Sequence, residues 1–207
     1  MSRIILFSAA SLAALSLAAC GDNMSSNTAM TTPTTETAPI DPAAAQNATR
    51  EAQDFVNAAG QASLVEIRTS EMALEKSASA DVKAFAQMMI ENHKASIDKL
   101  KAAAASASLM PPIDVLDDFH MRRINDLVET DGDADFDADY AALQIDAHND
   151  AINLFEDYSR DPDATAQLKM YTDGSLPTLQ THKAEAEAEA EKIRDIANKS
   201  DKTPNPS

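Results

Sequence analysis

Apolar side chains recur at helical spacing along most of this chain, and that pattern restricts the folds open to it. In the segment AFAQMMIENHKASIDKL, residues 84–100, the apolar stripe is formed by Phe85, Ala86, Met89, Ile97 and Leu100. Residues three, four, seven or eight positions apart lie on one face of an α-helix. The 207 residues include only four glycines, too few for the many tight turns of an all-β fold. The sequence therefore predicts long amphipathic helices.

The stripes divide into five predicted helices. We expect them over about 48–78, 80–106, 113–129, 136–160 and 163–198, the last with a kink near Gly174 and Pro177. Pro111 and Pro112 separate the second from the third, because proline cannot continue a helix. Short connections make the first two and the last two helices antiparallel hairpins. The fold class predicted is all-α: a ferritin-like four-helix bundle with a shorter crossover helix between two hairpins.

The N-terminus predicts export and lipid attachment. Residues 1–19 combine one positive charge, an apolar run and small residues, which is typical of a signal peptide. Leu17 to Cys20 resembles a bacterial lipobox, in which the cysteine is acylated with chains such as palmitate after cleavage. An ordinary signal with an incidental cysteine is the alternative. Gly21 in place of Asp favours the outer membrane, so we expect a cell-envelope protein on the periplasmic face, anchored through lipidated Cys20.

Composition sets the remaining boundaries and excludes one class of partner. Residues 20–47 have hardly any large apolar side chains and are predicted to be a disordered tether, with the bundle at 48–198 and a disordered tail at 199–207. The net charge of −17 repels nucleic acid, so we expect no nucleic-acid partner. A protein partner in the envelope and self-association both stay open.

Several segments resemble a known family. The stretch from Phe55 to Leu100, the segment FDADYAALQIDAHNDAINLFEDYS and the segment LPTLQTHKAEAE are similar to DUF4142, a bacterial domain family of unknown function described as ferritin-like. The pair Asn92-His93 after Phe85-Ala86 carries the most specific part, although members typically have an acidic residue where this chain has Asn92. The resemblance implies an exported helical bundle, often attached to the envelope, with no established reaction.

Each of the four long helices places one candidate metal ligand on or beside its inner face. These residues are Glu66, His93, His148 and His182. Counted from the helix ends, the first three fall at one level. His182 is displaced by roughly 10 Å along the bundle in the same count. His120, on the crossover, is expected to be a packed or rim histidine instead.

Two interpretations of these residues stay open, and a third is disfavoured. They could hold one divalent metal, with zinc, iron or copper as the ions that suit imidazole ligands. They could instead be buried polar groups that fix the register of the helices. A di-iron centre is disfavoured because no Glu-x-x-His pair occurs: Ile90, Ile145 and Leu179 stand three residues before the histidines. The acidic run 131–140 fails as a calcium loop, since Phe136 replaces the required glycine.

The function expected from the sequence is a noncatalytic envelope lipoprotein with a structural, stress-related or protein-contact role. The alternative is a metal-binding protein, with or without redox activity, that uses the Glu/His site inside the bundle. We assign no catalytic residue, and no substrate follows from the sequence.

Overall fold

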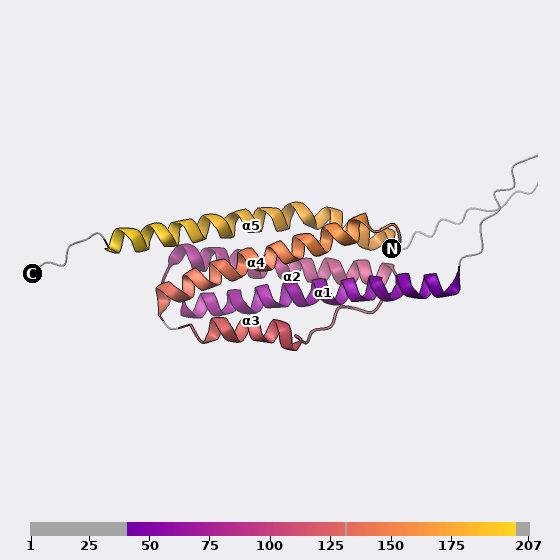
Figure 1. The fold of residues 1–207 in the computed structure, drawn as a ribbon, viewed down its shortest axis with the longest axis horizontal. Coiled ribbons are helices and arrows are strands. Elements are labelled where there is room, and N and C mark those ends of the chain that lie inside the picture. The colour runs from indigo at the N-terminus through magenta and orange to yellow at the C-terminus, as the bar shows by residue number, and fades with distance from the viewer. Residues whose placement is uncertain (1–40, 131, 202–207) are drawn as a thin grey trace, which may run out of the picture. The chain divides into compact units, whose positions relative to one another are not determined.

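The structure is a computed structural model that describes residues 41–130 and 132–201, and this part of the chain forms five helices (Figure 1). They are α1 (Pro42–Lys76), α2 (Ala80–Ser106), α3 (Asp118–Val128), α4 (Asp133–Arg160) and α5 (Ala166–Asp201). The predicted all-α fold is confirmed. Cys20, the predicted signal and most of the predicted tether lie outside the described residues.

Four of these helices make a bundle of two antiparallel hairpins. Helix α1 packs against α2 and α4, and α5 packs against α4 and α2, so that α2 and α4 are diagonal to each other. Figure 1 shows that the crossover carrying α3 runs back along the bundle, so α2 and α4 point the same way. Every adjacent pair is therefore antiparallel, which is the arrangement predicted from the connection lengths.

The crossover lies along the outside of α1 and is held there by polar contacts. The backbone N–H of Met110 donates to the Gln53 side chain over 2.8 Å, and that of Asp117 donates to Gln61 over 2.9 Å. At the far end Lys76 donates to the carbonyl of Val128 over 2.9 Å. Leu127 is the buried residue of α3. Most of this helix is a covering element outside the bundle core.

Several helix ends differ from the predicted ones. Helix α1 begins at Pro42, six residues before the predicted start, because Asp41 caps it and proline suits the first helical position. Helix α3 begins at Asp118, five residues later than predicted, where Asp117 accepts from the N–H of His120 over 2.9 Å. Helix α4 begins at Asp133 and α5 at Ala166. Helix α5 runs through Gly174 and Pro177 as one helix.

Two apolar clusters fill the two halves of the bundle. One joins Phe55, Leu100, Phe155 and Leu168 with their neighbours, and the other joins Phe85, Met89, Phe136 and Tyr140. All four bundle helices contribute to both clusters. The chain therefore has a segment on each helix that lies between the two clusters, and these four segments meet at one level.

Candidate metal centre

The four residues singled out from the sequence lie in the layer between the apolar clusters. On each helix, the candidate residue lies between a residue of one apolar cluster and a residue of the other. The sets are Ala59, Glu66 and Ala73 on α1; Met89, His93 and Leu100 on α2; Tyr140, His148 and Ala151 on α4; and Leu179, His182 and Ala186 on α5. Their exposed fractions are 1%, 2%, 0% and 2% in the same order. The bundle thus buries four titratable side chains in one layer.

The three imidazoles form a compact triangle. Ring centroids are 5.5 Å apart for His93 and His148, 5.2 Å for His93 and His182, and 5.4 Å for His148 and His182. One ring nitrogen from each lies within 4.8 Å of the corresponding nitrogens of the other two. Small rotations of the rings would bring such nitrogens onto one ion, for which metal–nitrogen bonds are about 2.0–2.1 Å.

His182 joins this triangle, so the displacement predicted for it is wrong. It lies 16 residues after Ala166, the start of α5, whereas His148 lies 12 residues before Arg160, the end of α4. The difference of four residues is about 6 Å of helix, less than the predicted displacement. Helix α5 starts three residues later than predicted. The connection 161–165 is long enough to begin it beyond the end of α4.

In two of the rings one nitrogen has a polar contact and the other has none. His148 Nδ1 donates to the carbonyl oxygen of Gln144 over 2.7 Å, which leaves Nε2 without a partner among the described residues. His182 Nε2 lies 3.0 Å from Nδ2 of the Asn92 amide, and its Nδ1 has no partner in the described part of the chain. A metal on Nδ1 of His182 requires a proton on Nε2, and the Asn92 amide accepts that proton once its oxygen and nitrogen exchange places.

Glu66 lies behind two of the imidazoles. Its Oε2 is 2.9 Å from Nδ1 of His93, and its Oε1 is 3.4 Å from Nδ1 of His148. The contact with His93 is close enough to act as a hydrogen bond that lowers the pKa of Glu66. Nε2 of His93 has no hydrogen-bond partner among the described residues. A carboxylate at Nδ1 of a histidine leaves Nε2 for a metal, the arrangement in which acidic groups commonly orient metal-binding imidazoles.

The electrostatics of this layer keep Glu66 ionised. Burial raises the pKa of the Glu66 carboxyl, but the facing imidazoles, His93 foremost, outweigh it and hold that pKa below its ordinary value. Within the described residues, no lysine or arginine forms an ion pair with Glu66. A buried carboxylate needs compensation, because an isolated buried charge costs several kcal/mol or more.

Two of the histidines are held neutral. Burial lowers the pKa of His148, and the nearby Glu66 carboxylate only partly opposes this. Burial together with His93 and His148 lowers the pKa of His182 to about 4. Neutral imidazole is the form that binds a metal, so these two side chains need lose no proton at neutral pH before ligation.

Two residues of this centre were not assigned a role from the sequence. Gln144 orients His148 through its backbone carbonyl, and its side-chain amide donates to Thr69 over 2.9 Å. Asn92 contacts His182 from the neighbouring helix. Two features of the sequence could have indicated these roles: Gln144 precedes His148 by four residues, and Asn92 is adjacent to His93. His120 lies outside the centre, where it pairs with Asp117 over 2.7 Å.

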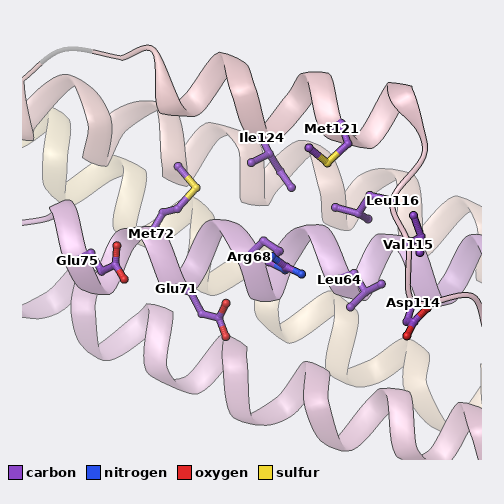
Figure 2. Close-up of a pocket in the computed structure, with 10 residues that line it drawn as sticks. All are labelled: Leu64, Arg68, Glu71, Met72, Glu75, Asp114, Val115, Leu116, Met121 and Ile124. Carbon is purple, nitrogen blue, oxygen red and sulfur yellow. The ribbon is translucent and has the colours of Figure 1, made fainter.

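A second hollow of the described residues lies away from this layer. Its volume is about 530 Å³, and it lies between α1 and the crossover (Figure 2). Leu64, Leu116, Met121 and Ile124 give it apolar walls, with Arg68 among them. No group of three or more side chains with metal-binding geometry lies there in the described part of the chain. The three buried histidines do not line this pocket.

Fold and site together define a class: a four-helix bundle with an outer crossover helix and a Glu/His cluster buried between its hairpins. The family model described as "Domain of unknown function (DUF4142)" matches residues 37–188, so the chain belongs to this family. Comparison with curated proteins and with solved structures found no match.

Proposed function

We propose that the protein binds one divalent transition-metal ion inside its helical bundle through His93, His148 and His182. The observation that carries this proposal is the group of three buried imidazoles whose nitrogens lie within 4.8 Å of one another. Glu66 acts behind them, orienting His93 and supplying negative charge.

The unpartnered nitrogens favour metal binding over a purely structural role. Buried polar atoms in proteins are nearly always hydrogen-bonded, and a group of unsatisfied ones requires an explanation. If these histidines only fixed helix register, their inward nitrogens would be expected to bond one another. Instead Nε2 of His148 and Nδ1 of His182 lack a partner among the described residues. A cation between the rings satisfies them and also offsets the buried charge of Glu66.

The ligand set restricts the ion. Imidazole suits zinc, copper, iron and nickel, whereas magnesium and calcium prefer oxygen ligands. Three histidines fit an ion that accepts four ligands or more, with zinc(II), iron(II) and copper(II) as the candidates. The centre has one carboxylate and no Glu-x-x-His pair, which separates it from the di-iron bundles.

The test is a set of thermal melts with and without zinc, ferrous iron or copper. A metal that binds only the folded protein raises its stability by about 2.7 kcal/mol at a free concentration 100-fold above Kd. For a domain of this size the melting temperature should rise by roughly 5–10 °C. His93→Leu should abolish the rise, and His120→Gln, which removes a histidine outside the centre, should keep it. A wild type that no metal stabilises, or an equal rise in His93→Leu, would refute the proposal.

We further propose that the bundle is held at the cell envelope by acylation of Cys20, with the outer membrane as the destination. The lipobox-like sequence from Leu17 to Cys20 supports this. None of the described helices is long and apolar enough to cross a membrane. Labelled palmitate should enter the wild-type chain in bacterial cells and not Cys20→Ala. Equal labelling of both would contradict the proposal.

A further inference from the structure

A cavity reaches the histidine cluster between α2 and α5. Its volume is about 140 Å³, and both His93 and His182 form part of its wall. One water requires only about 10–15 Å³ of such space, so the cavity has room for a small molecule beside the rings. A second, larger hollow on the same side of the bundle also includes Asn92 and His182. On the α2–α5 side, open space therefore adjoins two rings of the cluster.

The protein supplies three ligands and leaves a further position at the ion. Glu66 is not part of the group of three, and its oxygens lie at Nδ1 of His93 and Nδ1 of His148. Metal sites closed by four protein ligands are structural, whereas sites with three protein ligands hold an exchangeable water or other small ligand. By this count the centre belongs to the second type.

The residues around the cavity are suited to an oxygen-rich or anionic ligand. Ser96, Ser175 and Thr178 line it together with Lys99. Ser96 stands three residues after His93 on α2, and Thr178 stands four before His182 on the antiparallel α5, so both lie on the same side of the imidazole layer. The hydroxyls of Ser96 and Tyr171 are 3.0 Å apart, and Tyr171 also hydrogen-bonds Ser175. These hydroxyl groups can donate to a ligand oxygen, and Lys99 adds positive charge.

We infer that the metal centre binds a small anionic or oxygen-donor ligand from solvent, through the cavity between α2 and α5, at a coordination position that the protein leaves open. This inference rests on the proposed metal binding. It makes the site one that exchanges ligands instead of a closed structural one.

Gly174 offers a way to close the cavity without touching a metal ligand. It lies in the cavity wall, and a Cβ atom added to it would meet no atom within 4 Å. A large side chain at this position should therefore occupy the open space. Gly174→Phe is the blocking variant and Gly174→Ala is its matched control. Both replace glycine by a residue with a higher helix propensity, so the helix itself is not weakened.

The experiment uses the full chain loaded with cobalt(II), whose visible absorption reports its ligands, and azide as the probe ligand. Cobalt binding is measured first. Azide should then change the spectrum of the wild type and of Gly174→Ala, and Gly174→Phe should bind azide at least about tenfold more weakly. Gly174→Leu, a smaller blocking residue, replaces Gly174→Phe if the latter does not retain cobalt.

The outcomes separate this inference from the proposed function. A wild type that binds no cobalt overturns both. A wild type that binds cobalt with an unchanged spectrum in azide leaves the metal site standing and overturns the open position. An equal azide response in wild type and in the cobalt-loaded blocking variant overturns the cavity as the route.

Discussion

At the residue scale, Glu66 is the side chain whose environment most needs explanation. It is a carboxylate with 1% exposure that faces three imidazoles, two of which burial keeps neutral. In the proposed metal site, its charge would make His93 a stronger ligand and would offset the charge of the ion. Removing the charge while keeping the shape isolates this contribution.

Glu66→Gln should weaken metal binding without abolishing it. Residues behind metal ligands typically contribute a factor of about 10–100 in affinity. Competition titration with a chromophoric chelator measures this factor for wild type and variant. As a control, Glu71→Gln alters an exposed carboxylate that pairs with Lys94 at 3.6 Å and should leave the affinity unchanged. Equal affinity of Glu66→Gln and wild type would show that Glu66 has no role in the centre.

The same layer predicts how the metal-free protein responds to acid. His182, which faces His93, His148 and Glu66, has a pKa of about 4 in the folded protein and an ordinary value near 6.5 when unfolded. Between these values the unfolded chain binds more protons, so stability falls as the pH is lowered from about 6.5 towards 4. The pKa of Glu66 is also lowered in the folded protein. The stability that ionised Glu66 contributes is therefore lost as the pH falls through that lowered pKa, which is a change in the same direction.

Urea unfolding of the metal-free protein between pH 4 and 8 tests this response. The midpoint should be nearly constant above about pH 7 and should fall below about pH 6.5. The unfolding midpoint of His182→Leu should fall less steeply over that range, because this variant lacks one group that binds more protons in the unfolded chain than in the folded one. A wild-type midpoint that is flat from pH 7 to 4.5 would contradict the buried, neutral state of these histidines.

At the element scale, Gly60 and Gly174 are expected to respond in opposite ways to the same substitution. A Cβ at Gly60 would lie 2.5 Å from Cβ of Pro112, where the crossover presses on α1, whereas one at Gly174 meets open space. Gly174→Ala should stabilise the fold by about 0.5–1 kcal/mol, the usual gain within a helix. Gly60→Ala should lose that gain and lower the unfolding midpoint, because the crossover must shift. Thermal melts compare the stabilities of the two variants. An equal gain in stability in both would show that the crossover shifts away from Gly60 without a measurable cost.

The sequence predicted that the helices exist more accurately than it predicted the residues at which they begin and end. The apolar stripes of α2 and α4 carry their own signal, since each buries one face along its length. The first turns of α1 have no such stripe, because residues 41–47 are exposed. There the helix depends on the Asp41 cap and on Pro42, a signal obscured by the tether-like composition around it.

The level of each candidate ligand followed from counting only where a tight turn fixed the register. Glu66 and His93 flank the short turn around Ser77 and Ser79, where the N–H of Ser79 donates to the Ser77 hydroxyl over 3.0 Å. His182 depends instead on the connection 161–165, whose path is not set by the apolar pattern. For this reason, counting residues along the sequence predicted a position for His182 outside the layer. In the folded bundle, His182 lies in the layer between the two apolar clusters.

At the scale of the whole molecule, two apolar clusters hold four helices in register so that their polar residues meet. Neither hairpin contains the centre alone: Glu66 and His93 come from the first, and His148 and His182 from the second. A metal between them would join the two hairpins, and its binding would favour the assembled bundle over any separated form. The crossover lies outside this core, along α1, and away from the cavity between α2 and α5.

Metal binding by the three histidines can be seen directly in an anomalous difference map from crystals of the full chain grown with zinc, recorded at the zinc absorption edge. We predict one strong peak inside the bundle, at about 2.0–2.1 Å from ring nitrogens of His93, His148 and His182. We also predict that the Glu66 oxygens stay beside Nδ1 of His93 and Nδ1 of His148 and do not bind the zinc ion. Zinc peaks only at surface carboxylates, with the three imidazoles bonded to one another, would contradict these predictions.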